Sequence, residues 1–109
     1  MTDLFEDAEI ISSYTLDDAI ADGVLLPLLK SRWQKLSGGK PIVVTASLAA
    51  DLTGSALLGI WNDFVEWKNN VEQTLPEEDR LFSMTANNGK KVWVIEDGAA
   101  FTLMYPEDY

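Results

Sequence analysis

The sequence predicts an α+β fold, in which a C-terminal meander of three antiparallel strands packs against one long amphipathic helix. Two observations carry this prediction. Apolar residues recur with a helical period over about residues 56–73, and three short β-rich segments follow, separated by glycine-containing turns. With 109 residues and 47% hydrophobic content, the chain fits a single domain over residues 1–109 with a core of ordinary size.

A short helix is expected near the N-terminus, after an extended segment over residues 4–14. Thr15 has the side chain of a good N-cap, and Gly23 is a natural residue to follow a helix C-terminus. Asp17 and Asp18 fall in the first turn, where the helix dipole favours carboxylates. These signals predict a two-turn helix between Thr15 and Gly23.

The following stretch predicts alternating short strands and helices. Residues 24–29 fit a short strand, and residues 30–36 fit a second helix that a pair of glycines ends. Residues 41–45 fit a short buried strand that can join the sheet as its fourth strand. A short helix through Leu52 is then expected.

The longest helix is expected over about residues 56–73, with Ser55 as its N-cap. Its apolar side chains fall on one half of the helical wheel: Leu57, Leu58, Ile60, Trp61, Phe64, Val65, Trp67 and Val71. Lys68 and Glu72 lie four residues apart within this half, and we expect them to pair with each other. The helix therefore packs its apolar half on the sheet.

Three strands are expected at the C-terminus, over residues 81–86, 91–95 and 99–105. The dipeptide Asn88-Gly89 is a strong signal for a two-residue turn between the first two strands. Such a turn places Met84 opposite Trp93.

A three-residue turn, Glu96-Asp97-Gly98, is expected between the last two strands, with Gly98 in the left-handed conformation that such a loop needs. It pairs Trp93 with Phe101 and places six apolar side chains on one face of the sheet: Phe82, Met84, Trp93, Ile95, Phe101 and Leu103. A structure with Trp93 and Phe101 on opposite faces would refute this turn.

The side-chain inventory excludes most catalytic chemistry. The chain has no histidine and no cysteine, so it lacks the usual base of nucleophilic triads, a thiolate nucleophile and a cysteine-based zinc site. Carboxylate clusters are the remaining acid/base or metal-binding groups, and adjacent acids in turns are usually solvated surface. We therefore expect a protein that is not an enzyme and has no cofactor and no bound metal.

The charge balance predicts the kind of partner. Eighteen acids against eight bases give a net charge of −10, which repels nucleic acid and anionic membranes and favours a basic protein surface. The acidic start of the chain does not resemble a signal peptide, and the absence of cysteine fits a reducing compartment, so a cytoplasmic location is expected. Residues 30–40 carry four bases and no acid, and we expect them to pair with the acidic residues 1–22.

Carboxylates on the predicted helices and turns are the candidate binding groups. They are Asp17, Asp18, Asp22, Asp63, Glu66, Glu77, Glu78, Asp79, Glu96 and Asp97. An exposed aromatic side chain, Tyr105 or alternatively Tyr14 or Tyr109, is expected to anchor the interface. Carboxylates on rigid elements suit charge recognition, because flexible acids lose conformational entropy on binding.

Several segments share the pattern of one protein family: Ser13-Tyr14-Thr15, Ala19-Ile20, Asp22-Gly23-Val24-Leu25, Pro41-Ile42-Val43-Val44-Thr45 and Thr102-Leu103-Met104-Tyr105-Pro106-Glu107-Asp108. The chain resembles a family of small bacterial proteins of unknown function that occur on plasmids, prophages and other mobile elements. The middle of the chain departs from the pattern, and the resemblance implies no catalytic or binding residue. It implies a setting in which a small acidic protein acts against a host system.

Three hypotheses follow. The first is an interaction protein of a phage or mobile element that binds and inhibits a basic nucleic-acid-handling complex, such as a CRISPR effector or a restriction enzyme. The second is a structural or assembly module, as a homodimer or otherwise, whose acidity serves only solubility. The third is a carboxylate-based metal enzyme, which predicts that divalent metal raises the melting temperature.

Overall fold

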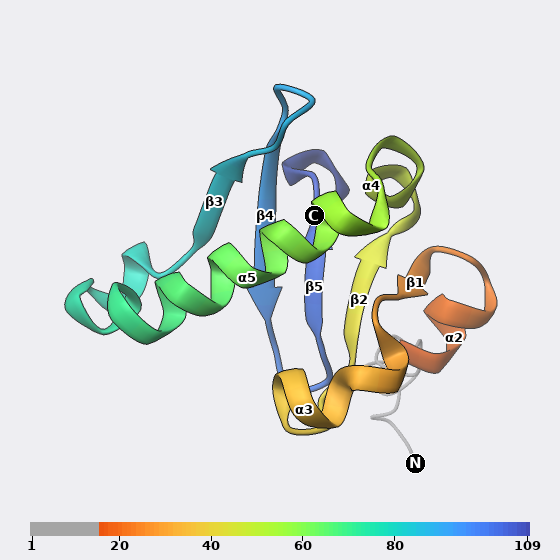
Figure 1. Cartoon of the computed structure of the whole chain (residues 1–109), viewed down its shortest axis with the longest axis horizontal. Coiled ribbons are helices and arrows are strands. Elements are labelled where there is room, and N and C mark those ends of the chain that lie inside the picture. Colours follow the sequence, from red (N-terminus) through yellow and green to blue (C-terminus); the bar gives the residue numbers. More distant parts are fainter. Residues whose placement is uncertain (1–15) are drawn as a thin grey trace, which may run out of the picture.

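The computed structural model describes residues 16–109, which build one mixed sheet packed against one long helix (Figure 1). Within these residues the sheet has five strands, in the spatial order β1 (Leu25–Pro27), β2 (Ile42–Thr45), β5 (Phe101–Met104), β4 (Lys91–Glu96) and β3 (Phe82–Thr85). β2 and β5 are parallel, and the other neighbours are antiparallel. The predicted α+β class is confirmed, and the sheet is larger than predicted because β1 and β2 both join it.

Helix α5 (Gly54–Asn70) crosses one face of the sheet (Figure 1). The shorter helical elements are α2 (Leu16–Ala21), η1 (Lys30–Arg32), α3 (Trp33–Ser37), α4 (Ala46–Asp51), η2 (Glu72–Thr74), η3 (Glu77–Asp79) and η4 (Pro106–Asp108), where η marks a 3₁₀-helix. In the described part of the chain no helix has the length and apolar character needed to cross a membrane. The predicted extended segment 4–14 and the Thr15 cap lie outside the described residues.

Local signals place most helix ends where the sequence predicts them. Gly23 and Gly38 have φ of +78° and +71° at the ends of α2 and α3, a conformation that glycine adopts without steric cost. Helix α5 differs at its start. The Thr53 hydroxyl accepts the N–H of Ala56 at 3.2 Å, so Thr53 is the N-cap rather than Ser55.

Aromatic side chains join α5 to the sheet. Trp61 and Phe64 are 2% and 3% exposed. The ring of Phe101 meets Trp61 edge-on at 5.1 Å, and that of Phe82 meets Phe64 in the same way at 5.6 Å. Such edge-to-face pairs add to the hydrophobic gain of burying the rings, so this cluster fixes the position of α5 over the sheet.

The turn between β3 and β4 is one residue longer than predicted. Its backbone hydrogen bonds close a three-residue loop over residues 87–89, in which Gly89 has φ of +83°. Met84 therefore pairs with Val92 instead of Trp93. The glycine supplies the left-handed residue of a longer loop rather than half of a two-residue turn.

The turn between β4 and β5 is one residue shorter than predicted. The Asp97 carboxylate accepts two backbone N–H groups inside the turn, at 2.8 and 2.9 Å, and Gly98 does not have a positive φ. The side-chain acceptor stabilises a tighter turn that needs no left-handed glycine. Phe101 consequently pairs with Glu96 instead of Trp93.

These two differences move Trp93 and Ile95 to the sheet face that points away from α5, opposite to Phe101. The three-residue turn predicted at residues 96–98 is therefore wrong. The side chains that β4 buries under α5 are Val92 and Val94, at 0% and 2% exposure. A register shift of one residue exchanges the faces of a strand, so a single extra loop residue is enough to move a tryptophan to the other face of the sheet.

Candidate functional site

The acidic residues predicted to bind a partner lie at two ends of the molecule. Asp17, Asp18 and Asp22 are exposed on and beside α2. The acids of η3 precede β3, which is the edge strand at the other side of the sheet from β1. The predicted set therefore does not form one continuous patch.

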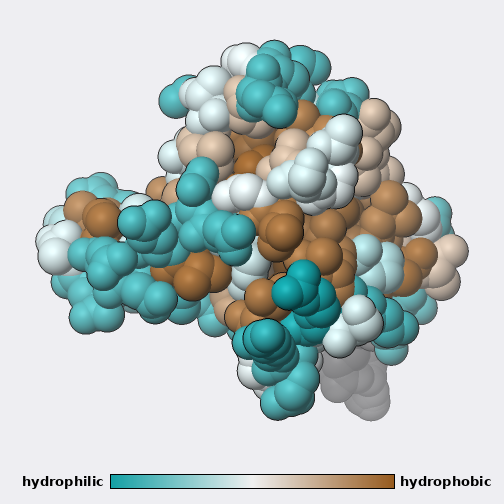
Figure 2. Space-filling model, viewed as in Figure 1, coloured by the Kyte–Doolittle hydropathy of each residue, from teal (hydrophilic) through white to brown (hydrophobic). Residues whose placement is uncertain are grey.

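Five exposed carboxylates lie on α5 and η3, the two helical elements that flank the edge strand β3, and we call them the acidic lobe: Asp63, Glu66, Glu77, Glu78 and Asp79. Asp63 lines a shallow depression together with Met84 and Ala86, which places this flank of α5 beside β3. Helix η3 leads directly into β3 from the other side. This end of the molecule is mostly hydrophilic on the face shown in Figure 2.

Within residues 16–109, none of the acidic lobe carboxylates forms an ion pair. Asp63 and Glu66 project from a helix of 17 residues that is anchored in the core. Helix η3 is a short turn that is held by its own backbone hydrogen bonds. Their negative charge is therefore held on ordered backbone and left uncompensated, which is the arrangement expected for recognition of a basic surface.

Glu96 does not belong to the free acidic surface that the sequence predicts. Its carboxylate accepts from Lys68 at 2.8 Å and from Lys40 at 3.2 Å. Lys68 also contacts Glu72 at 3.5 Å, which confirms the pair predicted four residues apart. Most of the predicted partners of basic residues 30–40 lie outside the described part of the chain.

The protonation of this cluster follows from its contacts. Partial burial acts to raise the pKa of Glu96, but the hydrogen bonds from both lysines outweigh it and hold the pKa below its usual value. The hydrogen bond to Glu96 in turn raises the pKa of Lys68. Glu96 stays ionised and neutralised at neutral pH, so it is a structural ion pair rather than a partner-binding group.

Tyr105 is likewise wrong as an exposed anchor. It is 3% exposed, its hydroxyl donates to Asp51, and Asn88 donates to its oxygen at 3.1 Å. Lys90 lies 5.3 Å from its ring centroid. Burial, followed by the hydrogen bond to Asp51, raises the pKa of Tyr105. Its role is to join β5 to α4 and to the β3–β4 loop.

Asp108 was not among the predicted binding residues, yet it holds the C-terminus in place. Its carboxylate accepts from the hydroxyls of Thr45 and Ser47 at 2.8 and 2.7 Å. Burial acts to raise the pKa of Asp108, but these hydrogen bonds and one from the backbone N–H of Tyr105 hold it below its usual value. The next residue, Tyr109, is thereby positioned near Trp93, with ring centroids 6.0 Å apart.

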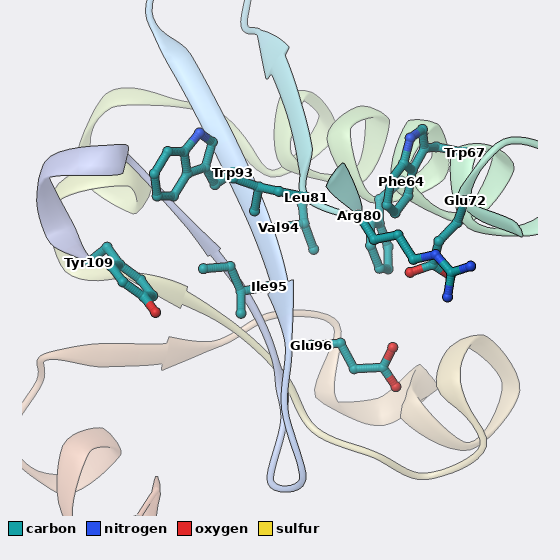
Figure 3. Close-up of a pocket in the computed structure, with 10 residues that line it drawn as sticks. All are labelled: Phe64, Trp67, Glu72, Arg80, Leu81, Trp93, Val94, Ile95, Glu96 and Tyr109. Atoms are coloured by element: carbon teal, nitrogen blue, oxygen red, sulfur yellow. The ribbon is translucent and has the colours of Figure 1, made fainter. Parts of the chain in front are cut away.

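A hollow of about 450 Å³ lies beside the start of β3, and we call it the edge hollow (Figure 3). Figure 3 shows Phe64 and Trp67 on its α5 side and Trp93 and Tyr109 on its other side. Leu81 and Arg80 come from the segment that leads into β3. The sequence did not indicate this hollow, because it depends on the register that turns Trp93 away from α5.

Asp97 is exposed, but both N–H contacts of its carboxylate belong to the β4–β5 turn. Among residues 16–109, no group of three or more acidic, histidine or cysteine side chains is arranged to hold a metal ion.

The chain gives no match in comparison with known proteins: no family model, curated protein or solved structure is significantly similar to it.

Proposed function

We propose that this protein is a non-enzymatic interaction protein whose acidic lobe binds a basic protein surface and blocks it. The observation that carries the proposal is a set of five exposed carboxylates without ion pairs on α5 and η3, the two elements that flank the edge strand β3. Other acids at the same end are neutralised internally, as Glu96 is by two lysines. The charge that remains exposed is therefore localised and ordered.

The physical advantage of this arrangement is electrostatic. Carboxylates on fixed backbone lose little conformational entropy on binding, and complementary charge accelerates association and excludes partners of the wrong sign. Extended basic surfaces belong above all to proteins that bind nucleic acids. The proposed target is therefore a nucleic-acid-handling complex of a bacterial cytoplasm, such as a defence nuclease, and the proposed setting is a phage or mobile element.

Two charge-matched variants test the proposal. The lobe variant carries Glu66→Gln, Glu77→Gln and Glu78→Gln. The α2 variant carries Asp17→Asn, Asp18→Asn and Asp22→Asn. Each raises the formal net charge by three from −10, so global charge is the same in both.

Tagged wild type and both variants are used to capture proteins from nuclease-treated bacterial lysate at low salt, followed by elution at high salt and mass spectrometry. We expect wild type and the α2 variant to release the same basic nucleic-acid-binding protein, and the lobe variant to lose it. Equal capture by both variants would show that the lobe is not the binding surface. Melting temperatures of all three proteins control for folding.

A second candidate function, self-association, is favoured by one observation. Val24 and Leu26 at the edge strand β1 are 52% and 39% exposed, so they form an apolar contact surface at the edge of the sheet. If β1 mediates a homodimer, sedimentation equilibrium at high protein concentration gives a dimer that Leu26→Ser dissociates. A monomer for wild type under those conditions excludes it.

A further inference from the structure

The outer edge of β3 is an open end of the sheet. β3 is the last strand in the spatial order, and within residues 16–109 no strand pairs with its outer side (Figure 1). Its four residues include no proline and no charged side chain, and its register with β4 is continuous, without a bulge. Proteins commonly protect an edge strand with one of these features, because free backbone groups can pair with another chain. β3 is therefore able to accept a further strand.

The hydrogen-bond pattern shows which backbone groups face this open edge. The N–H of Ala86 donates to the carbonyl of Lys90 at 2.9 Å, so these two residues form a hydrogen-bonded pair of the ladder. In an antiparallel ladder every second residue directs its N–H and C=O toward the partner strand. Met84 therefore faces β4, whereas Ser83 and Thr85 direct their N–H and C=O outward. This spacing of two residues is what an added strand requires.

The opposite edge of the sheet is interrupted by a proline. β1 spans three residues, and Pro27 is the last of them. The N–H of Leu28 donates to the carbonyl of Ile42, so Leu28 faces β2 and Pro27 occupies an outward position, where it has no N–H to donate. The two edges therefore differ, and β3 is the better site for an added strand.

A depression of about 170 Å³ lies on the α5 side of β3. Gly59 and Ile60 of α5 line it together with Met84 and Ala86, and no atom lies within 4 Å of the place where a side chain on Gly59 would begin. An apolar cavity of about 150 Å³ takes one benzene ring. The depression therefore has the size for one apolar side chain, and a strand added to β3 directs every second side chain to this face.

The charge around the edge is mainly negative. Asp63 lines the depression, and two residues separate the three acids of η3 from β3. The neighbouring bases are Arg80 and Lys91, while Lys90 contacts Asp51 at 3.8 Å. The five carboxylates of the acidic lobe outnumber them, which favours a segment that carries lysine or arginine. Two copies of this chain would instead bring two acidic lobes together, so charge opposes pairing of β3 with itself.

We propose that an extended basic segment of the partner protein adds to the sheet as a sixth strand, paired with Ser83 and Thr85, with one apolar side chain in the depression. The proposal rests on the function proposed above and names the form in which the partner binds. Backbone hydrogen bonds supply affinity, and the flanking charges and the depression select the sequence. Because backbone pairing tolerates different side chains, a short model peptide serves as the probe.

The probe is the acetylated and amidated peptide Lys-Lys-Thr-Val-Thr-Lys-Lys, which has basic ends and a central apolar side chain. Binding is followed by amide hydrogen exchange in ¹H–¹⁵N NMR spectra of the whole protein. We expect a Kd of about 1 mM, because a short flexible peptide loses conformational entropy on binding. At ten times this concentration, exchange at Ser83 and Thr85 slows about tenfold, since only the free protein exchanges there. The amides of Met84 and Ala86 already face β4 and are expected to change little.

Two further peptides test the backbone pairing without altering the protein. One is N-methylated at both threonines, and the other at the valine and the lysine that follows it. Alternate amides of a strand face opposite sides, so only one of the two methylation patterns blocks pairing with β3. We expect one peptide to lose binding and the other to retain it.

Protein variants separate the edge from the charge. Thr85→Pro removes an outward N–H but no hydrogen bond to β4, and is expected to weaken binding about tenfold. Thr85→Val keeps this N–H and is expected to bind like wild type. The lobe variant is expected to bind about tenfold more weakly, and the α2 variant like wild type. Melting temperatures of all variants control for folding.

Four results would overturn the proposal. Exchange at Ser83 and Thr85 that stays unchanged with about 10 mM peptide, or equal effects of both methylation patterns, would exclude strand addition. Protection of these amides by high protein concentration alone would make a second copy the occupant. Equal affinity of the lobe and α2 variants would contradict the basic character of the segment. If strand addition fails while the lobe variant still loses its partner in the lysate, the proposed function stands without it.

Discussion

The buried hydroxyl of Tyr105 offers the sharpest test of the structure. Tyr105→Phe removes a hydrogen bond to the Asp51 carboxylate and one from Asn88, while the ring stays in place. A hydrogen bond to a charged group contributes about 1.5–3 kcal/mol. Because the Asp51 side chain is 42% exposed, water can replace part of the lost contact. The expected net loss is therefore about 1–2 kcal/mol.

The assay is urea unfolding at pH 7 followed by tryptophan fluorescence, together with thermal unfolding. A loss of this size lowers the melting temperature of a domain of this length by roughly 5–10 °C. Tyr109→Phe is the matched control, because this residue is 83% exposed and the variant is expected to unfold like wild type. If Tyr105→Phe is as stable as wild type, then the residue is not packed as described, and an exposed anchoring role would regain support.

Three further variants probe other contacts. Glu96→Gln removes the carboxylate that joins two lysines and is expected to cost about 1 kcal/mol at pH 7. The pKa of Glu96 in the folded protein lies below its ordinary value of 4.5, so this stabilisation is present above pH 4.5 and is lost as pH falls through the folded pKa. The unfolding curves of variant and wild type should therefore converge in acid. Asp108→Asn is expected to weaken the C-terminal contacts by about 1–2 kcal/mol at pH 7, with the same direction of pH dependence, and to separate Tyr109 from its tryptophan neighbour in NMR spectra. Gly89→Ala strains a residue with φ of +83° and should cost about 1 kcal/mol in urea unfolding, whereas Gly98→Ala meets open space at an ordinary φ and should cost nothing.

Features encoded by neighbouring residues could be predicted from the sequence. The helical apolar repeat located α5, and the glycines after α2 and α3 marked helix ends that the structure confirms. The pairing of Lys68 with Glu72 also follows from a spacing of four residues. Each of these depends on contacts within one helical turn or on the conformational freedom of one residue.

The strand register could not be predicted, because each turn has an alternative that uses the same residues. Gly89 supports a three-residue loop as well as a two-residue turn, and the Asp97 side chain supplies hydrogen bonds that make a shorter turn favourable. The pairing of β3 with β4 moved by one residue and that of β4 with β5 by three, and an odd shift exchanges the two faces of a strand. The position of Trp93 on the sheet face away from α5, and with it the edge hollow, depends on that register.

For the candidate site too, local features could be predicted from the sequence and long-range contacts could not. Exposure of the acidic lobe follows from its position on a polar helix face and in a turn, which sequence patterns indicate. The neutralisation of Glu96 by Lys40 depends on contact between residues 56 positions apart, and the burial of Tyr105 on contact with Asp51, 54 positions away. Long-range contacts of this kind leave no local signal in the chain.

The central claim is that the acidic lobe recognises a basic surface through charge. The most direct measurement is the affinity of the captured partner for wild type and for the lobe variant as a function of salt concentration. We predict that wild-type affinity falls steeply with salt, and that the lobe variant binds more weakly at low salt with a shallower dependence. Parallel salt dependence with equal affinity in both proteins would contradict the claim.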